Sequence, residues 1–372
     1  MFRTALCDLL GIEHPILQSG MGNIAGPDLV AEVSSAGGLG ILAGLNVPPD
    51  VLRDGIREVR KRTSRPFGVN LWLHETVESP VDVATIPDTT VAGAQRELNR
   101  YRERLGIPTT SARPATLPAL LPSAIDVILE ERVPVFSTAL VRHHHAELVQ
   151  RCHARGVKVV TMVTTVDAAR AAAASGVDVI VAQGGEAGGH RSVGDKPASA
   201  EAVGIGTMAL VPQIVDAVQV PVVAAGGIAD GRGLVAALAL GATGVLLGTR
   251  FVASREATVP EFWKKALLEH ESDATAITDV FTGLWARALR NTMSEEYRTS
   301  GAPVLPPLVQ RAAAFDVYAA SAKQQNREYY PMFSGQSVGL IHDLPGAGEV
   351  VATIMREAQD VLAALPRRAN RG

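Results

Sequence analysis

The chain has 372 residues, of which 47% are hydrophobic by type, and its 35 basic and 38 acidic residues leave a formal net charge of −3. This near-neutral balance excludes the strong basic bias of a nucleic-acid-binding surface. No run of about 18 or more apolar residues and no signal-peptide pattern are present, so we expect no membrane segment and a cytoplasmic location. Cys7 and Cys152 lie far apart and form no C-x-x-C pair, which predicts free thiols in a reducing compartment.

Short apolar, β-branched runs alternate along the chain with longer alanine-rich segments of helical period, the pattern of repeated βα units. Eight strands are predicted, at 15–17, 39–42, 67–71, 133–137, 157–163, 177–182, 220–225 and 244–247. The helices between them are clearest at 28–36, 50–61, 123–131, 146–155, 166–175 and 231–240.

The later predicted strands are almost wholly apolar, so both of their faces should be buried, as in a parallel sheet covered by helices. Eight such units match an α/β fold of the (β/α)8 TIM-barrel type. A doubly wound open sheet would produce a similar string of elements and stays as the alternative. The number of strands and the order of the motifs favour the barrel.

Two segments break this alternation. Residues 74–122 contain many of the prolines and one polar helix, which predicts an inserted excursion after the third strand. Residues 254–334 follow the eighth strand without the βα pattern, and we expect them to cap the C-terminal face of the barrel, where catalytic loops gather. The predicted organisation is a barrel over 1–253 with that insertion, a capping substrate segment, and a C-terminal segment over 335–372 whose amphipathic helix packs back on the barrel.

Two glycine-rich loops follow the seventh and eighth predicted strands. In AAGGIADGRG, Gly226 and Gly227 let the backbone approach an anion, and the N-terminus of the following helix favours negative charge. In LLGTRF, Gly248 and Thr249 offer N–H and hydroxyl donors. Because the loops after strands seven and eight of a barrel commonly form one phosphate site, these loops predict a phosphate-bearing ligand. The alternative is that the glycines only form tight turns.

The loop after the sixth predicted strand, QGGEAGGHRS, contains the main candidate for acid–base chemistry. A histidine has an ordinary pKa near neutrality and suits the role of general base, and His190 lies among glycines on the catalytic face. A loop histidine is usually only solvated, but these surroundings favour a function. Glu186 is a second possible acid or base, although such a residue more often braces its loop.

The sequence predicts no metal site. It has no H-E-x-x-H motif and no clustered Cys/His spacing. The three consecutive histidines at 143–145 would point in different directions at a helix start, so they cannot ligate one ion together.

The loop after the first strand, QSGMGNIAGPDL, and the GVNL segment of the third strand both lie where a flat cofactor would meet a barrel. Gly20, Met21 and Gly22 can place backbone groups along a cofactor edge, and Asn70 can form hydrogen bonds with ring heteroatoms. The alternative is an ordinary turn and an asparagine that satisfies the core. The candidate aromatic residues for a substrate pocket are Trp72, Trp285, Tyr329 and Tyr330.

Taken together, these segments resemble the nitronate monooxygenase family, formerly called 2-nitropropane dioxygenases. The most specific part is QGGEAGGHRS, followed after about thirty residues by PVVAAGGIADGRG and then GTRF. ITDVFTGLWARALRN and SGQSVGLI are similar to further segments of that family. Three positions depart from the family pattern: Gly20 stands where proline is more common, Leu284 where arginine is expected, and Trp285 is unusually bulky. These departures affect the expected substrate more than the expected cofactor.

The resemblance implies a (β/α)8 barrel with non-covalent FMN that oxidises alkyl nitronates with O2 to a carbonyl compound and nitrite, after one electron passes to FMN. It implies that His190 orients the nitronate near flavin N5 and removes the α-proton from neutral nitroalkanes. The implied flavin-binding residues are Gly20, Met21, Gly22, Asn70, Gln183, Gly188 and Gly189, and those around the phosphate are Gly226, Gly227, Gly248 and Thr249.

Two other functions stay open. An FMN-dependent NAD(P)H reductase of enoyl thioesters or quinones shares the barrel, the FMN and the EAGGH loop. The absence of a second G-x-G-x-x-G fingerprint speaks only weakly against it. A non-catalytic flavin- or phosphate-ligand-binding protein is the third option. We expect a small-molecule substrate and O2 as partners, with neither nucleic acid nor membrane, and the oligomeric state stays open, including a homo-oligomer.

Overall fold

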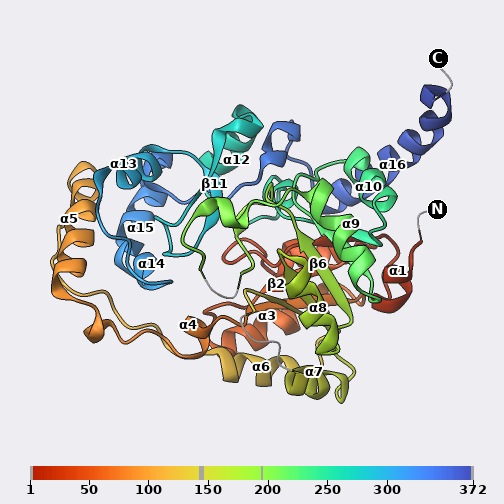
Figure 1. Ribbon diagram of the computed structural model, residues 1–372, viewed down its shortest axis with the longest axis horizontal. Coiled ribbons are helices and arrows are strands. Elements are labelled where there is room, and N and C mark those ends of the chain that lie inside the picture. Colours follow the sequence, from red (N-terminus) through yellow and green to blue (C-terminus); the bar gives the residue numbers. More distant parts are fainter. Residues whose placement is uncertain (1–2, 142–145, 194–195, 370–372) are drawn as a thin grey trace.

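Eight parallel strands enclose the core of the protein in the computed structural model, which describes residues 3–141, 146–193 and 196–369 (Figure 1). The histidines at 143–145 lie outside the described residues. The strands are β1 (Ile16–Gln18), β2 (Gly40–Ala43), β3 (Phe67–Trp72), β4 (Val135–Ala139), β5 (Lys158–Val163), β6 (Val179–Gln183), β8 (Val222–Ala225) and β9 (Gly244–Leu247).

The strands follow the order β1-β9-β8-β6-β5-β4-β3-β2, so each pairs with its neighbours around a ring. A parallel bridge between Leu17 and Leu39 joins β1 to β2 and closes it. The predicted TIM barrel is confirmed, and the alternative of an open sheet is wrong. All eight predicted strands are present, and no end is shifted by more than two residues.

Alternation along the strands builds two apolar layers. Leu17, Val135 and Val181 belong to a cluster inside the barrel, whereas Ile16 and Phe136 face the surrounding helices. Because successive side chains of a strand point to opposite faces, strands that are apolar throughout are buried on both sides. Helix α1 (Ala5–Leu10) contributes to the inner cluster and closes the N-terminal end of the barrel.

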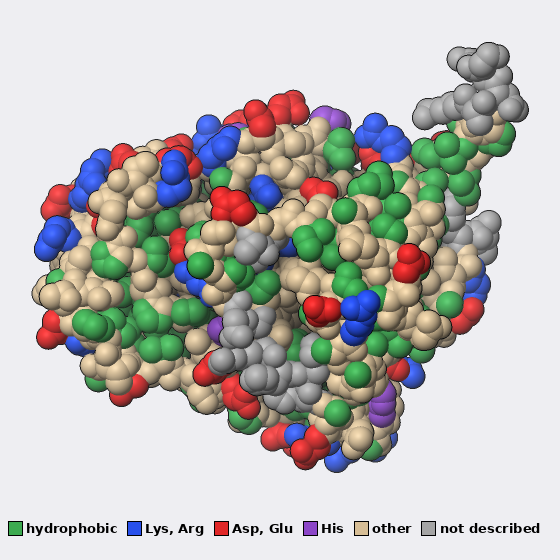
Figure 2. Space-filling model, in the orientation of Figure 1, with side chains coloured by type: hydrophobic (Ala, Val, Ile, Leu, Met, Phe, Trp, Pro, Cys, Tyr) green, Lys and Arg blue, Asp and Glu red, His purple; other side chains and the backbone are tan. Residues whose placement is uncertain are grey.

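The helices that surround the barrel are α2 (Pro27–Ser35), α3 (Pro49–Arg62), α6 (Leu121–Glu130), α7 (Ala146–His153), α8 (Val166–Ala174), α9 (Thr207–Ala217) and α10 (Gly231–Ala239). The C-terminal helix α16 (Ala347–Ala369) packs against α10 and α2. None of the described helices has the length and apolar character needed to cross a bilayer. Side chains of both charges are interspersed over the face shown in Figure 2.

The insertion and the capping segment, far apart in sequence, fold together into a second lobe (Figure 1). Leu98 and Tyr101 of helix α5 share one hydrophobic cluster with Phe281, Tyr297 and Val317. The helical elements of these two segments are α4 (Glu75–Glu78), η1 (Val83–Thr85), α5 (Asp88–Arg104), α12 (Glu261–Glu269), η3 (Ser272–Ala274), α13 (Thr292–Ser300), α14 (Val309–Ala313), α15 (Phe315–Lys323) and η4 (Arg327–Tyr329). The short helix α11 (Thr249–Val252) follows β9 and belongs to the barrel. We call this cluster and its helices α5, α13, α14 and α15 the second lobe.

A small antiparallel sheet connects the barrel to the second lobe. Its strands are β10 (Thr275–Thr278), β11 (Ala286–Leu289) and the two-residue β7 (Gly189–His190), which belongs to the loop after β6. Two further 3-10 turns, η2 (Ala200–Val203) and η5 (Gln336–Leu340), complete the described elements. The sheet therefore fixes the predicted catalytic loop to residues of the lobe.

Candidate active site

His190 lies at the C-terminal end of the barrel, and its backbone is held from two directions. In the small sheet it pairs with Ala286 of β11. From the barrel, Gln183 Nε2 donates to the His190 carbonyl at 2.9 Å, while Gln183 Oε1 accepts from Ser192 N at 2.8 Å. Both polar atoms of the Gln183 amide are thus engaged within the loop. Gln183 shapes the loop that presents His190.

The imidazole of His190 is enclosed by side chains from several elements. Its Nε2 lies 2.9 Å from the hydroxyl of Thr282, and its ring lies 4.6 Å from the Trp72 ring and 5.0 Å from the Phe333 ring. Burial, followed by the positive charge of Arg311 and the influence of His74, lowers the pKa of His190 to about 3. The ring is therefore neutral at physiological pH.

Thr282 can select the tautomer of this ring. Its hydroxyl lies 3.4 Å from the Leu284 carbonyl as well as 2.9 Å from His190 Nε2. When the hydroxyl donates to Leu284, it can accept the Nε2–H of His190. The lone pair of the ring then remains on Nδ1, the nitrogen available to a substrate.

The two predicted phosphate loops meet the requirements of an anion. Gly226 and Gly227 have φ values of 107° and 71°, a backbone shape that favours glycine. In the part of the chain that the structure describes, the N–H groups of Gly226, Gly227 and Gly248 donate to no protein acceptor. Thr249 accepts a hydrogen bond from Gly335 N at 2.9 Å, and its own hydroxyl proton is left to donate. Unused N–H groups at an open glycine turn suit a phosphate.

The predicted contribution of the helix after β8 is wrong. The side chain of Asp230 accepts from the N–H groups of Arg232 and Gly233, and Glu357 accepts from Gly231 N at 3.0 Å. These two carboxylates already satisfy the first turn of α10 and bring negative charge there, which disfavours an anion. An anion would therefore be held by the loops alone.

A buried arginine beside the loop lacks acceptors. Arg191 is 1% exposed, its Nη2 donates to the Gln183 carbonyl at 3.1 Å, and its Nε and Nη1 have no partner among the described residues. Burial, and then the positive charge of Arg287, lowers the pKa of Arg191 to about 10. Since buried polar groups are normally paired, Arg191 requires an acceptor that the described residues do not supply. An oxygen-rich group such as a flavin fits this donor and the open glycine loops.

The loop after β1 lies against β3 and against Gly248, the residue that follows β9. A Cβ on Gly20 would overlap Asn70, and a Cβ on Gly248 would lie 3.6 Å from the sulfur of Met21. A side chain on Gly22 would meet no atom within 4 Å, so that position is open. Asn70 Nδ2 donates to Ser137 Oγ at 3.1 Å, which leaves its carbonyl oxygen for another partner.

Among the remaining residues of the loop after β6, some positions are tightly packed and others are open. A Cβ on Gly188 would overlap Gly335, whereas one on Gly189 would meet no atom within 4 Å. Glu186 accepts from Thr207 N at 2.9 Å and from the Thr207 hydroxyl at 2.8 Å, so it braces the start of α9. Glu186 thus stabilises the loop, and its carboxylate is occupied.

Of the four predicted pocket aromatics, Trp72 contacts His190. Trp285 donates its Nε1–H to the Pro197 carbonyl at 2.8 Å and lies 5.0 Å from Lys196 Nζ. Tyr329 packs against Tyr101 in the second lobe, and Tyr330 against Phe262 and Trp263. Sequence reasoning missed Thr282, Phe333 and Arg311, because nothing local in the sequence places these residues beside the EAGGH loop. It also missed Arg191, which directly follows His190, because the burial of this side chain and its free donors leave no local signal.

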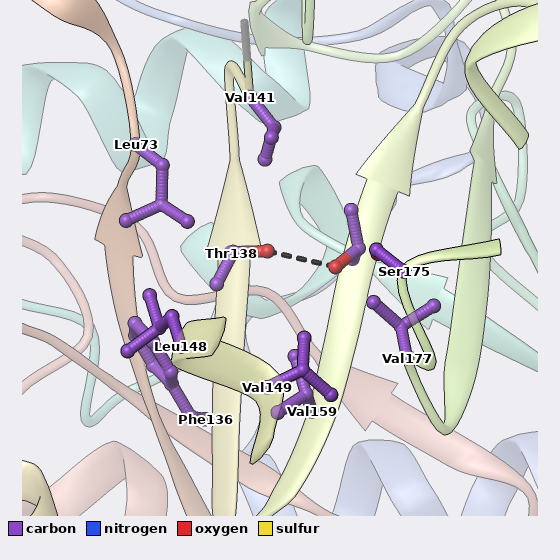
Figure 3. A pocket seen from close by; sticks show the side chains of 10 residues that line it. Leu73, Phe136, Thr138, Val141, Leu148, Val149, Val159, Ser175 and Val177 are labelled. Atoms are coloured by element: carbon purple, nitrogen blue, oxygen red, sulfur yellow. Dashed lines mark hydrogen bonds between the residues drawn. The ribbon is translucent and has the colours of Figure 1, made fainter. Parts of the chain in front are cut away.

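Two cavities have linings that do not include His190. A cavity of about 20 Å³ among Leu73, Thr138 and Val177 has room for about one water, and the Thr138 and Thr161 hydroxyls lie 2.9 Å apart there (Figure 3). A wider groove of about 430 Å³ runs between residues 81–90 and 304–307. The first is too small for a cofactor, and the second lies on the lobe side of Gly283.

Comparisons with known proteins agree with these motifs. A family model described as nitronate monooxygenase matches residues 3–357. Proteins named as nitronate monooxygenases from Staphylococcus saprophyticus and Staphylococcus aureus strain Newman are 33% and 34% identical, and each alignment covers 96–97% of this chain and 98% of that protein.

Solved structures give the same picture. A nitroalkane oxidase from Streptomyces ansochromogenes has 31% identity and a TM-score of 0.86, covering 97% of this chain and 100% of that one. FabK from Thermotoga maritima has 30% identity and a TM-score of 0.74, covering 99% and 100%. Both are similar to this chain over nearly its whole length.

Proposed function

The chain belongs to the nitronate monooxygenase family, and on that premise we propose that it uses FMN and O2 to oxidise alkyl nitronates to a carbonyl compound and nitrite. As a member of this family the chain is a flavin-dependent oxidoreductase that acts on a small molecule. The finer assignments, to FMN, to nitronates and to His190, rest on the site.

The observation that carries this proposal is the state of His190. A ring whose pKa lies near 3 is neutral but is a weak base, so it is poorly matched to removing a proton from a neutral nitroalkane. A nitronate has already lost that proton. His190 then needs only to orient the substrate through Nδ1, with Thr282 fixing the ring and Trp72 and Phe333 excluding water.

The residues that would hold FMN follow from the same geometry. The N–H groups of Gly226, Gly227 and Gly248 and the hydroxyl of Thr249 would hold the phosphate. Met21, the Asn70 carbonyl oxygen and the unpaired Arg191 donors would face the ring system. A bound flavin supplies the one-electron acceptor that nitronate oxidation requires.

The test is anaerobic mixing of the purified flavoprotein with propionate 3-nitronate, and separately with NADH and NADPH, while flavin absorbance is followed. We expect the nitronate, and neither nicotinamide, to reduce the flavin, and air to restore the oxidised spectrum with release of nitrite. Mass spectrometry of the cofactor released by denaturation should give FMN and not FAD. Reduction by NADH or NADPH alone would overturn the proposal.

The second candidate is an FMN-dependent NAD(P)H reductase of enoyl thioesters or quinones. The likeness to FabK, at 30% identity over nearly the whole chain, supports it. The same experiment separates the two functions, because a reductase takes its electrons from the nicotinamide.

A further inference from the structure

Two arginines of the second lobe, the exposed Arg96 and the half-buried Arg311, have no hydrogen-bond or ion-pair partner among the described residues. Arg100, Arg102, Arg104 and Arg298 each form an ion pair with a carboxylate, the last three at 2.7–3.0 Å. Arg311 is half-buried and forms no hydrogen bond or ion pair with any residue that the structure describes. A partly desolvated guanidinium without an acceptor is costly unless something binds it.

The nearby carboxylates are committed elsewhere. Asp279 pairs with Lys196 at 2.5 Å, and Asp316 pairs with Arg102 at 2.8 Å. Glu97 accepts from the Tyr101 hydroxyl at 2.9 Å and also pairs with Arg100. The lobe therefore leaves the positive charge of Arg311 uncompensated.

The backbone brings this charge to the active site. Leu308 N donates to the Thr282 carbonyl at 2.7 Å, and the Thr282 hydroxyl lies 2.9 Å from His190 Nε2. Helix α14 starts at the next residue, with Gln310 fully buried and donating to the Val280 carbonyl at 3.0 Å. Arg311 thus lies within one helical turn of the residue that is bonded to Thr282.

The charge of Arg311 affects the pKa of three titratable groups from different elements. After burial, it is the largest cause of the lowered pKa of His190. It also opposes the effect of burial, which raises the pKa of Tyr318 and of Tyr330. This agrees with the backbone geometry, which places Arg311 within one helical turn of Leu308 and so on the side of Thr282 and His190.

We propose that Arg311 binds the anionic nitro group of the nitronate and thereby sets a preference for nitronate anions over neutral nitroalkanes. This inference rests on the proposed function and assigns to Arg311 a role in selecting its substrate. The two oxygens of a nitronate share one negative charge in a plane, and the guanidinium fork can bind such a group with two parallel hydrogen bonds. Neutral His190 adds no competing charge.

The experiment compares Arg311→Met with wild type on the flavin-loaded enzyme, using propyl-2-nitronate, propionate 3-nitronate and neutral 2-nitropropane. We expect KM for both nitronates to rise roughly 10- to 100-fold, the range for a lost charge-assisted hydrogen bond, and KM for 2-nitropropane to change little. Arg311→Lys should fall between the two. Arg298→Met, which removes an exposed, paired charge of the same lobe, is the matched control and should behave as wild type.

A second readout does not depend on turnover. Isobutyrate has the shape and charge of propyl-2-nitronate but cannot be oxidised, and its affinity is measurable by titration calorimetry. We expect Arg311→Met to weaken isobutyrate binding by the same factor as KM. Unchanged isobutyrate binding together with unchanged nitronate KM would overturn the role of Arg311.

The outcomes separate the two proposals. An effect on propionate 3-nitronate alone would assign Arg311 to the remote carboxylate and overturn the nitro-group assignment. If wild type oxidises no nitronate while isobutyrate still needs Arg311, the proposed function fails and the anion site stands.

Discussion

The barrel and the second lobe are held together in different ways. In the barrel, the strands are joined by hydrogen bonds, and their apolar side chains point alternately to the inner and the outer layer. In the lobe, one buried arginine does much of the joining: Arg102 of α5 pairs with Asp316 and also donates to Gln95, Asn99 and the carbonyl of Ala313. A short-range pattern of apolar residues along each strand thus specifies the barrel. The lobe instead depends on contacts between residues far apart in sequence, such as Arg102 and Ala313, which are 211 positions apart.

The active site lies where these two regions meet. The glycine loops and His190 come from the barrel, whereas Thr282, Phe333 and Arg311 come from the lobe side. Changes confined to one region should therefore alter separate properties: retention of the cofactor for the barrel and handling of the substrate for the lobe.

The largest effect is expected at the junction. Replacing His190 by Asn should lower turnover of preformed nitronates roughly 100-fold, the cost of a misplaced substrate, because the ring that orients the nitronate is lost, while the flavin stays bound. Turnover of neutral nitroalkanes should not fall by a larger factor, because a ring with a pKa near 3 is a poor base for removing their proton. Oxygen consumption with both substrate forms measures this, with exposed His153→Asn as control. A loss confined to neutral nitroalkanes would contradict the orienting role and would make His190 a general base.

A substitution that affects the second lobe alone should have the next largest effect. Arg102→Leu removes buried hydrogen bonds and one member of an ion pair, and should lower the free energy of unfolding by about 3 kcal/mol. Urea denaturation should show activity lost at lower urea than flavin fluorescence is released, because the barrel core is intact. The exposed Arg100, which pairs within its own helix, provides the control variant Arg100→Leu. A single coincident transition would show that the lobe is not an independent unit.

Breaking the barrel side should change cofactor retention. Gly227→Leu places a side chain at a φ of 71° beside the open N–H groups, and FMN should bind roughly 10-fold more weakly. Equilibrium dialysis measures the dissociation constant. Gly55→Ala on helix α3 should leave it unchanged, because a Cβ there meets only the end of Leu42 at 3.4 Å. Full flavin occupancy in Gly227→Leu would remove this loop from the phosphate site.

The smallest effect concerns pH. Because burial and Arg311 lower the pKa of His190 to about 3, the ring is neutral above about pH 4 and its charge does not change between pH 6 and 8. The kcat/KM for a preformed nitronate should vary less than about 2-fold over that window. Stopped-flow reduction of the flavin checks this. A titration with a midpoint near 6.5 would mean that His190 is not buried as described.

The sequence predicted the barrel well because each of its eight strands is a short apolar run that can be recognised without knowing the others. It did not predict helix α9, whose internal Pro212 resembles a break although the helix runs over Thr207–Ala217. It treated the insertion and the cap separately, because the pairing of Arg102 with Asp316 leaves no periodic trace. The glycine loops were recognisable from composition, but the Asp230 cap on α10 and the unpaired Arg191 and Arg311 depend on distances in space.

The two-residue strand β7 has a consequence for how such enzymes diversify. His190 belongs to the barrel chain, yet its backbone is paired with Ala286 of β11, and Gly189 with Arg287. Any substitution in the lobe that shifts β11 re-aims the imidazole without altering a single barrel residue. The residues that would hold the flavin and the residues that select the substrate can therefore change independently in evolution. Substrate choice can change while flavin binding is kept.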